Sequence, residues 1–192
     1  MQAARGTSVE AGAGTIAPPR RARLWGLFVA VAAVLYASDV ITKIIAVERL
    51  SGRPDVSVVG EVLQLHLTRN PGAAFSTGTQ FTVALSCVAI VAVTVVLWLS
   101  RRIGSVGWAI ALGALLAGIM GNLTDRLVRD PGPFRGHVID FLMLPNWPVF
   151  NVADICINIG AALILVQAFR GIRIDGTRER RADDESESES AE

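Results

Sequence analysis

Cysteine and histidine are scarce in this chain of 192 residues, which contains only two of each. Cys87 and Cys156 both lie in apolar runs, where the ordinary interpretation is a small buried side chain. The chain lacks any Cys/His spacing typical of a metal site, including the His-Glu-x-x-His pattern of zinc proteases. It also lacks the Gly-x-Ser-x-Gly elbow of serine hydrolases. We therefore expect no metal and no cofactor.

Charged residues are also few, at 18%, whereas 52% of the residues are hydrophobic. This balance predicts an integral membrane protein with one domain. The acidic, serine-rich run at 183–189 cannot form a core and is expected to be disordered. Most arginines sit at the ends of apolar segments, which fits an anionic membrane surface better than nucleic acid.

Four apolar segments approach the roughly 20 residues that cross ~30 Å of hydrocarbon as a helix. They predict an all-α membrane domain over residues 20–172, between disordered cytoplasmic tails at 1–19 and 173–192. Glycines in the third segment would let helices approach closely. The first segment can also be read as a signal peptide, but it is long for one and has no clear cleavage site. The segments run from about Leu24 to Val47, Phe81 to Leu99, Val106 to Leu127, and Val149 to Phe169.

Arginine placement predicts the orientation of these helices. Arginines precede the first segment, lie between the second and third, and follow the fourth. All three places fall on one side of a four-helix topology, so both termini should be cytoplasmic. In the first outer loop, residues 56–59 and 62–68 alternate apolar and polar around Gly60. This pattern predicts a small extracytoplasmic β element, with Leu63, Leu65 and Leu67 resting on the membrane.

Five short polar clusters interrupt or border the apolar segments. The number of residues between each cluster and the end of its helix gives its depth, and by this measure all five lie in one plane at the outer membrane–water boundary. Polar groups near lipid are costly and default to a functional role, although contacts that merely fix the bundle remain the alternative. The clusters are Asp39-Val40-Ile41-Thr42-Lys43, Asn70-Pro71-Gly72-Ala73-Ala74-Phe75, Gly121-Asn122-Leu123-Thr124-Asp125-Arg126, Val138-Ile139-Asp140-Phe141 and Phe150-Asn151-Val152-Ala153-Asp154.

Three aspartates compete for a role in carboxylate chemistry, in which one carboxyl acts as a base while its partner carries a proton. Asp125 is followed by Arg126 and lies one turn from Arg129, and a neighbouring cation should keep it ionised as an orienting group. Asp140 has apolar neighbours that favour a raised pKa, and Asp154 begins a membrane helix. These settings favour Asp140 and Asp154 but leave Asp125 as a third candidate.

Taken together, the five clusters resemble the lipoprotein signal peptidase family, bacterial signal peptidase II, over about residues 24–170. The resemblance implies four helices with cytoplasmic termini and an outer β cradle. It also implies a metal-free aspartyl endopeptidase that cuts diacylglyceryl-prolipoproteins just before the lipidated cysteine and that globomycin inhibits at its aspartate dyad. By motif match the dyad is Asp140 and Asp154. The residues that would support the dyad or hold substrate are Asp39, Lys43, Asn70, Asn122, Asp125, Arg126 and Asn151.

The alternative is a non-enzymatic function, that of a small four-helix transporter or assembly factor. Its supporting feature is the Asp39 and Lys43 pair, which lie one turn apart on one helical face and can form an ion relay. A transporter should place polar groups near the midplane and show internal repeats. Neither property is visible in the sequence.

Overall fold

The computed structural model describes residues 20–72 and 81–178. The tail expected at 1–19, residues 179–192 of the tail expected at 173–192, and residues 73–75 of the second polar cluster lie outside the described residues. Within them are four helices that are long and apolar enough to cross a membrane, which confirms the predicted architecture. They are α1 (Arg20–Leu50), α2 (Thr82–Ser100), α3 (Val106–Val128) and α4 (Val152–Phe169).

Helix α1 is longer than the apolar segment that predicted it. Its 31 residues give a length of about 46 Å, well beyond the hydrocarbon thickness. The additional residues at its C-terminal end bring Leu50, together with Ala46, against Ile139 and Phe141 of the sheet described below. The polar residues that precede Leu50 suggested an earlier end, but burial of this turn extends the helix.

A three-stranded antiparallel sheet has the order β1 (Val56–Val59), β2 (Leu63–Asn70) and β3 (Val138–Met143). The first two strands confirm the predicted β element, whereas β3 comes from the second outer loop and was not predicted. Leu65 and Leu67 are partly buried and pack toward the end of α1, while the prediction that this β element rests on the membrane stays a prediction. Side chains alternate along a strand, and this face of β2 is the one that α1 covers.

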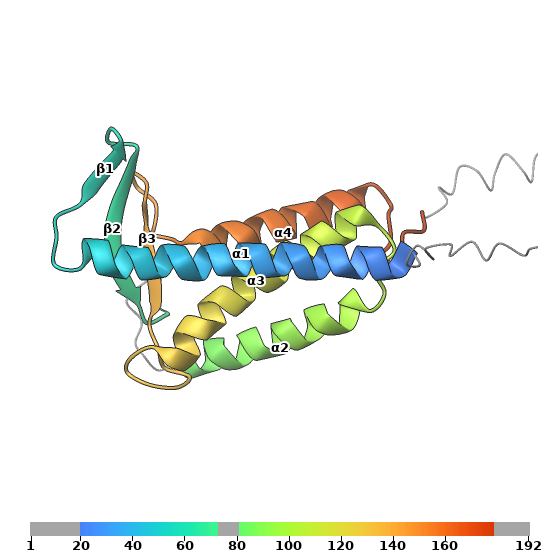
Figure 1. The fold of residues 1–192 in the computed structure, drawn as a ribbon, viewed down its shortest axis with the longest axis horizontal. Coiled ribbons are helices and arrows are strands. Elements are labelled where there is room, and N and C mark those ends of the chain that lie inside the picture. The colour runs from blue at the N-terminus through green and yellow to red at the C-terminus, as the bar shows by residue number, and fades with distance from the viewer. Residues whose placement is uncertain (1–19, 73–80, 179–192) are drawn as a thin grey trace, which may run out of the picture.

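Figure 1 shows the sheet standing across one end of the helical bundle, while the described chain begins and ends at the opposite end. Strand β3 pairs with β2 so that Asp140 lies opposite Thr68 and Val138 lies opposite Asn70. The chain then turns through residues 144–151 and enters α4 beside the sheet (Figure 1). Residues from the first and second outer loops are therefore brought to the same end of the bundle.

Glycines allow the helices to approach as the sequence predicted. A Cβ atom on Gly113 would lie 2.9 Å from the backbone oxygen of Phe28 in α1, and one on Gly118 would collide with α4. Gly160 in α4 allows a similar close contact, since a Cβ atom there would lie 2.8 Å from the backbone nitrogen of Leu115. Small residues at such contacts are the usual basis of helix packing in membranes.

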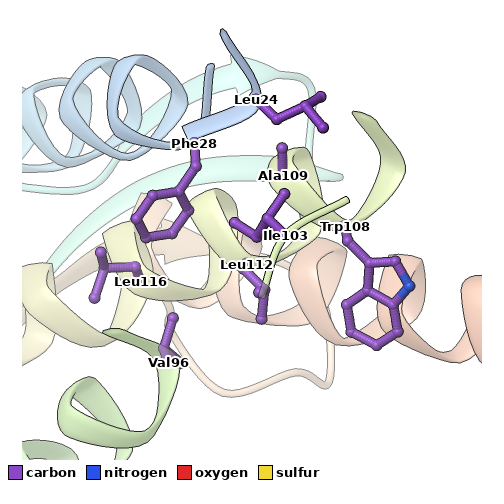
Figure 2. Close-up of a cluster of buried hydrophobic side chains, with 8 residues drawn as sticks. All are labelled: Leu24, Phe28, Val96, Ile103, Trp108, Ala109, Leu112 and Leu116. Atoms are coloured by element: carbon purple, nitrogen blue, oxygen red, sulfur yellow. The ribbon is translucent and has the colours of Figure 1, made fainter. Parts of the chain in front are cut away.

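The larger apolar cluster lies at the end of the bundle away from the sheet (Figures 1 and 2). Figure 2 shows Phe28 facing the aliphatic side chains of α3, with Trp108 at the edge of the cluster. This packing fixes α1 as part of the bundle, which argues against the signal-peptide interpretation of the first segment. The cluster contains Leu24, Phe28, Val96, Ile103, Trp108, Ala109, Leu112 and Leu116.

The close contact at Gly160 predicts a specific loss of stability. Gly160→Val should destabilise the bundle by about 1–3 kcal/mol because the added methyl groups meet the backbone of α3. Thermal unfolding in micelles measures this effect. Gly26→Val is the matched control, since a Cβ atom at Gly26 meets nothing within 4 Å. Equal unfolding temperatures for the two variants would contradict the proposed packing.

Candidate active site

Asp154 is fixed by the first turn of α4. Asn151 is the N-cap residue, and its side-chain oxygen accepts a hydrogen bond from the Asp154 backbone N–H at 3.0 Å. The Asp154 carboxylate in turn accepts from the Asn151 backbone N–H at 3.1 Å, which completes a capping box. A negative side chain is favoured at a helix N-terminus, so local helix chemistry sets the position of this carboxylate.

Asp140 lies on β3 and is 3% exposed. Its carboxylate accepts hydrogen bonds from the side-chain amides of Asn70 at 2.9 Å and Asn151 at 2.6 Å. Burial, assisted by the nearby charge of Asp154, raises the pKa of Asp140 to about 6, although the two amides and the Lys43 charge act to lower it. A carboxyl with this pKa can hold or release a proton near neutral pH.

Two asparagines connect the aspartates. Asn122 of α3 donates its amide to the Asp154 carboxylate at 2.9 Å, and Asn151 donates to Asp140. The asparagines also contact each other, since the Asn151 amide lies 3.2 Å from the Asn122 side-chain oxygen. One series of hydrogen bonds therefore links the two carboxylates, and its members come from β3, α3 and the start of α4.

The Lys43 ammonium group is buried next to these asparagines. It lies 2.8 Å from the Asp39 carboxylate, 2.9 Å from the Asp125 carboxylate and 3.0 Å from the Asn122 side-chain oxygen. The expected pairing of Asp39 with Lys43 is therefore confirmed. Two buried carboxylates share one cation, and Arg129 supplies a second positive charge to Asp125.

Asp39 and Asp125 also bind backbone next to the two aspartates of the site. Asp39 accepts a hydrogen bond from the Ala153 N–H at 2.8 Å, one residue before Asp154. Asp125 accepts from the Ile139 N–H at 3.2 Å, one residue before Asp140. The buried ion cluster therefore sets the backbone position of both Asp140 and Asp154.

Asp140 and Asp154 line one cavity of about 490 Å³. Asn70, Asn122 and Arg126 are among the other polar residues that line this cavity. Its apolar lining includes Trp147, Phe150 and Ile155. Among the described residues, Nη1 of Arg126 is buried without a hydrogen-bond partner. The cavity therefore offers two carboxylates, amides and a guanidinium to a molecule with apolar parts.

Comparison with known proteins identifies this arrangement. The profile of the family described as signal peptidase (SPase) II matches residues 31–170. The chain belongs to the signal peptidase II family. It is therefore a hydrolase of the aspartic peptidase type, which sets the transporter interpretation aside.

Curated relatives support this family over most of the chain. A lipoprotein signal peptidase of Mycobacterium tuberculosis (strain ATCC 25618 / H37Rv) is 44% identical over 167 residues, 87% of this chain and 81% of the relative. The protein of that name from Mycobacterium avium (strain 104) is 44% identical over 169 residues, 88% and 91% of the two chains. One from Leifsonia xyli subsp. xyli (strain CTCB07) is 48% identical over 151 residues, 78% and 70% of the two chains.

Two solved structures of bacterial membrane enzymes, obtained by the in meso method, share the fold. One, at 2.3 Å resolution, has a TM-score of 0.66 at 22% identity and covers 81% of this chain and 95% of its own. The other, at 1.9 Å, has a TM-score of 0.68 at 23% identity and covers 76% and 94%. Together with the four apolar helices, they establish this signal peptidase II chain as a multi-pass membrane protein.

The nine residues predicted for the site are brought together by the fold. Eight belong to the hydrogen-bonded and ion-paired network, and Arg126 joins them at the cavity wall. The expectation that Arg126 pairs with Asp125 was wrong, because the described ion pairs of Asp125 are with Lys43 and Arg129. Apolar wall residues such as Trp147 were not predicted, since they carry no motif.

The environment of Asp140 predicts a titration near neutral pH. Its carboxyl should be protonated below pH about 6 and ionised above, because burial disfavours the charged form. Infrared difference spectra in micelles should show a protonated carboxyl band that is lost as pH rises through this value. The band should be missing in Asp140→Asn. A band of unchanged intensity in that variant would show that another carboxyl titrates.

Removal of the buried cation should destabilise the protein. Lys43→Met leaves Asp39 and Asp125 close together in the interior, and the loss of one partner from a buried ion pair costs about 3–5 kcal/mol. Thermal unfolding in micelles tests this expectation. Adding Asp39→Asn to Lys43→Met should recover part of the loss, and a double variant less stable than the single one would contradict the charge argument.

Proposed function

We propose that this chain removes the signal peptide from diacylglyceryl-modified prolipoproteins, with Asp140 and Asp154 as the catalytic pair. The observation that carries the proposal is that two buried carboxylates, joined through Asn122 and Asn151, line one cavity. Membership of the signal peptidase II family and the names of the relatives support the substrate class. The scissile bond is the one just before the lipidated cysteine.

The two carboxylates have different surroundings, which suit one to act as the base and the other as the acid. Asp154 accepts hydrogen bonds from the Asn122 side-chain amide and the Asn151 backbone N–H at the start of α4, and these hold its carboxylate where it can take a proton from water. Asp140, with its raised pKa, holds the proton that polarises the scissile carbonyl oxygen. Water adds to the carbonyl carbon as its proton passes to Asp154. The tetrahedral intermediate collapses when that proton reaches the departing amine, and the proton on the oxygen returns to Asp140.

The remaining polar residues hold this arrangement or the substrate. Asp39, Lys43 and Asp125 fix the backbone beside the pair, and Asn70 holds Asp140 from β2. Arg126 lines the same cavity as the carboxylates, and its buried Nη1 donor has no hydrogen-bond partner among the described residues. We assign it to a carbonyl oxygen of the substrate, since a buried donor without a partner is costly until a ligand arrives.

The apolar side of the cavity fits a substrate that stays in the bilayer. Ile155 and Ile159 line it along α4 and are 38% and 50% exposed, so lipid chains and the signal helix can reach the carboxylates from the membrane. The arginine-rich end of the bundle is cytoplasmic in this proposal, which puts both termini inside the cell and the cavity at the outer face of a bacterial plasma membrane. Globomycin would occupy the space between the carboxylates and compete with substrate.

Replacement of either catalytic carboxyl should abolish turnover. Asp140→Asn and Asp154→Asn are each expected to lower the rate of cleavage by at least about 100-fold, the scale of a lost general acid or base. The measurement is cleavage of a diacylglyceryl-modified precursor in micelles, with globomycin as the reference inhibitor.

Asp125→Asn is the matched control because Asp125 acts through Lys43 and the Ile139 backbone rather than at the scissile bond. It should reduce thermal stability and slow turnover without eliminating it. Full activity in Asp140→Asn or Asp154→Asn, with normal folding, would remove that residue from the catalytic pair.

A further inference from the structure

The chain continues past α4 as a folded segment that the proposed function does not use. Residues 171–178, here called the strap, fold back under the bundle, although a disordered tail was expected to begin at residue 173. Ile172 and Arg178 form an antiparallel bridge, and the Ile174 carbonyl accepts a hydrogen bond from the Gly104 N–H at 2.8 Å. The Trp108 indole donates to the Ile172 carbonyl at 2.9 Å. The strap therefore has a defined position.

The contact between the strap and the connection from α2 to α3 leaves no room for side-chain atoms at Gly104. A Cβ atom there would collide with the backbone of Asp175, and one on Gly176 would lie 2.6 Å from the Gly104 carbonyl oxygen. Backbone packed this closely holds the flanking side chains in place. Arg102 and Arg173 therefore belong to two segments whose backbones are fixed to one another.

Positive charge dominates this end of the bundle. Asp175 is the only acidic residue that the described chain places there, and its carboxylate accepts hydrogen bonds from the Thr177 backbone N–H at 3.0 Å and hydroxyl at 2.7 Å. These bonds lower the pKa of Asp175, and its charge is directed into the strap. The arginines at this end are Arg20, Arg21, Arg23, Arg101, Arg102, Arg170, Arg173 and Arg178.

Two adjoining cavities lie among these arginines and share Arg102 and Asp175. One, of about 440 Å³, has Arg102 and Arg173 at its rim, with Trp108 among its apolar residues. The other, of about 320 Å³, has Arg20, Arg21 and Arg102 at its rim and Leu24 within. Trp108 and Leu24 belong to the apolar cluster of Figure 2, so each cavity joins a cationic rim to a hydrophobic floor.

We propose that these two cavities bind the head group and glycerol region of an anionic glycerophospholipid. The phosphate would meet Arg102 and its neighbours, and the start of the acyl chains would lie on the apolar floor. The cavities lie where α2 and α4 end at Ser100 and Phe169, which is the depth of a lipid head group. Arg102 also stacks over the half-exposed Trp98, with 4.6 Å between its guanidinium carbon and the ring centre.

The acidic run of this chain, residues 183–189, is the competing occupant. Its charge also complements the arginines, but it consists of Asp, Glu and Ser and offers nothing to the apolar floors. A phospholipid satisfies both halves of the cavities. The bilayer also holds lipid at the level of the cavities, which favours its binding over a polar segment.

Lipid retention by the full-length protein tests the proposal. The protein is placed in neutral detergent with phosphatidylglycerol or with phosphatidylcholine of the same acyl chains, and retained lipid is counted by native mass spectrometry. We expect phosphatidylglycerol to be retained preferentially and to raise the unfolding temperature. Arg102→Gln, which alters both cavities, should weaken retention about fivefold, the usual contribution of one arginine near an anionic surface.

Three comparisons make the outcome decisive. Arg49→Gln, in the last turn of α1 at the opposite end, should leave retention unchanged. Arg20→Gln alters only the smaller cavity and should cause a partial loss, which serves if Arg102→Gln folds poorly. Equal retention of the two lipids, or equal effects of Arg49→Gln and Arg102→Gln, would overturn the proposal. So would an Arg102→Gln effect that vanishes when residues 183–192 are deleted, since the acidic run would then be the occupant.

Discussion

The ammonium group of Lys43, enclosed between Asp39 and Asp125, is the interaction on which the rest of the structure depends. It joins α1 to α3, and its two carboxylate partners reach the backbone of α4 at Ala153 and of β3 at Ile139. Buried ion pairs are poor sources of net stability but fix one arrangement strongly, because any other leaves a charge unpaired. In this protein the fixed arrangement is the relative position of a strand and a helix.

That constraint explains why the two halves of the site can come from different kinds of structure. Asp154 is held by the capping box of a membrane helix, and Asp140 is held on a strand that covers the end of the bundle. Neither element alone determines the separation of the two side chains. Asn122 and Asn151 span the gap with amides that can donate to one carboxylate and accept from another group, which adjusts the pair without adding charge.

Much of this organisation was predictable from the sequence, and the failures have identifiable physical causes. The four helices follow from apolar runs of sufficient length, and β1 and β2 follow from alternation. Strand β3 was missed because residues 138–143 are apolar on both faces apart from Asp140, so no alternation marks them. Both Arg126 and Arg129 lie near Asp125 in the sequence, and the prediction chose Arg126 as its partner. The ion pair forms with Arg129, which lies four residues later on the same helical face. The contact with Lys43 is long-range and has no local signal.

Both ends of the described chain emerge at the end of the bundle opposite the sheet (Figure 1). A linker, an affinity tag or a reporter domain attached to either end therefore starts far from the cavity that contains the carboxylates. Immobilisation through that end would present every molecule on a surface with its cavity facing away from the support. The same geometry would allow the two ends to be joined by a short linker, which would give a closed chain with an unobstructed cavity.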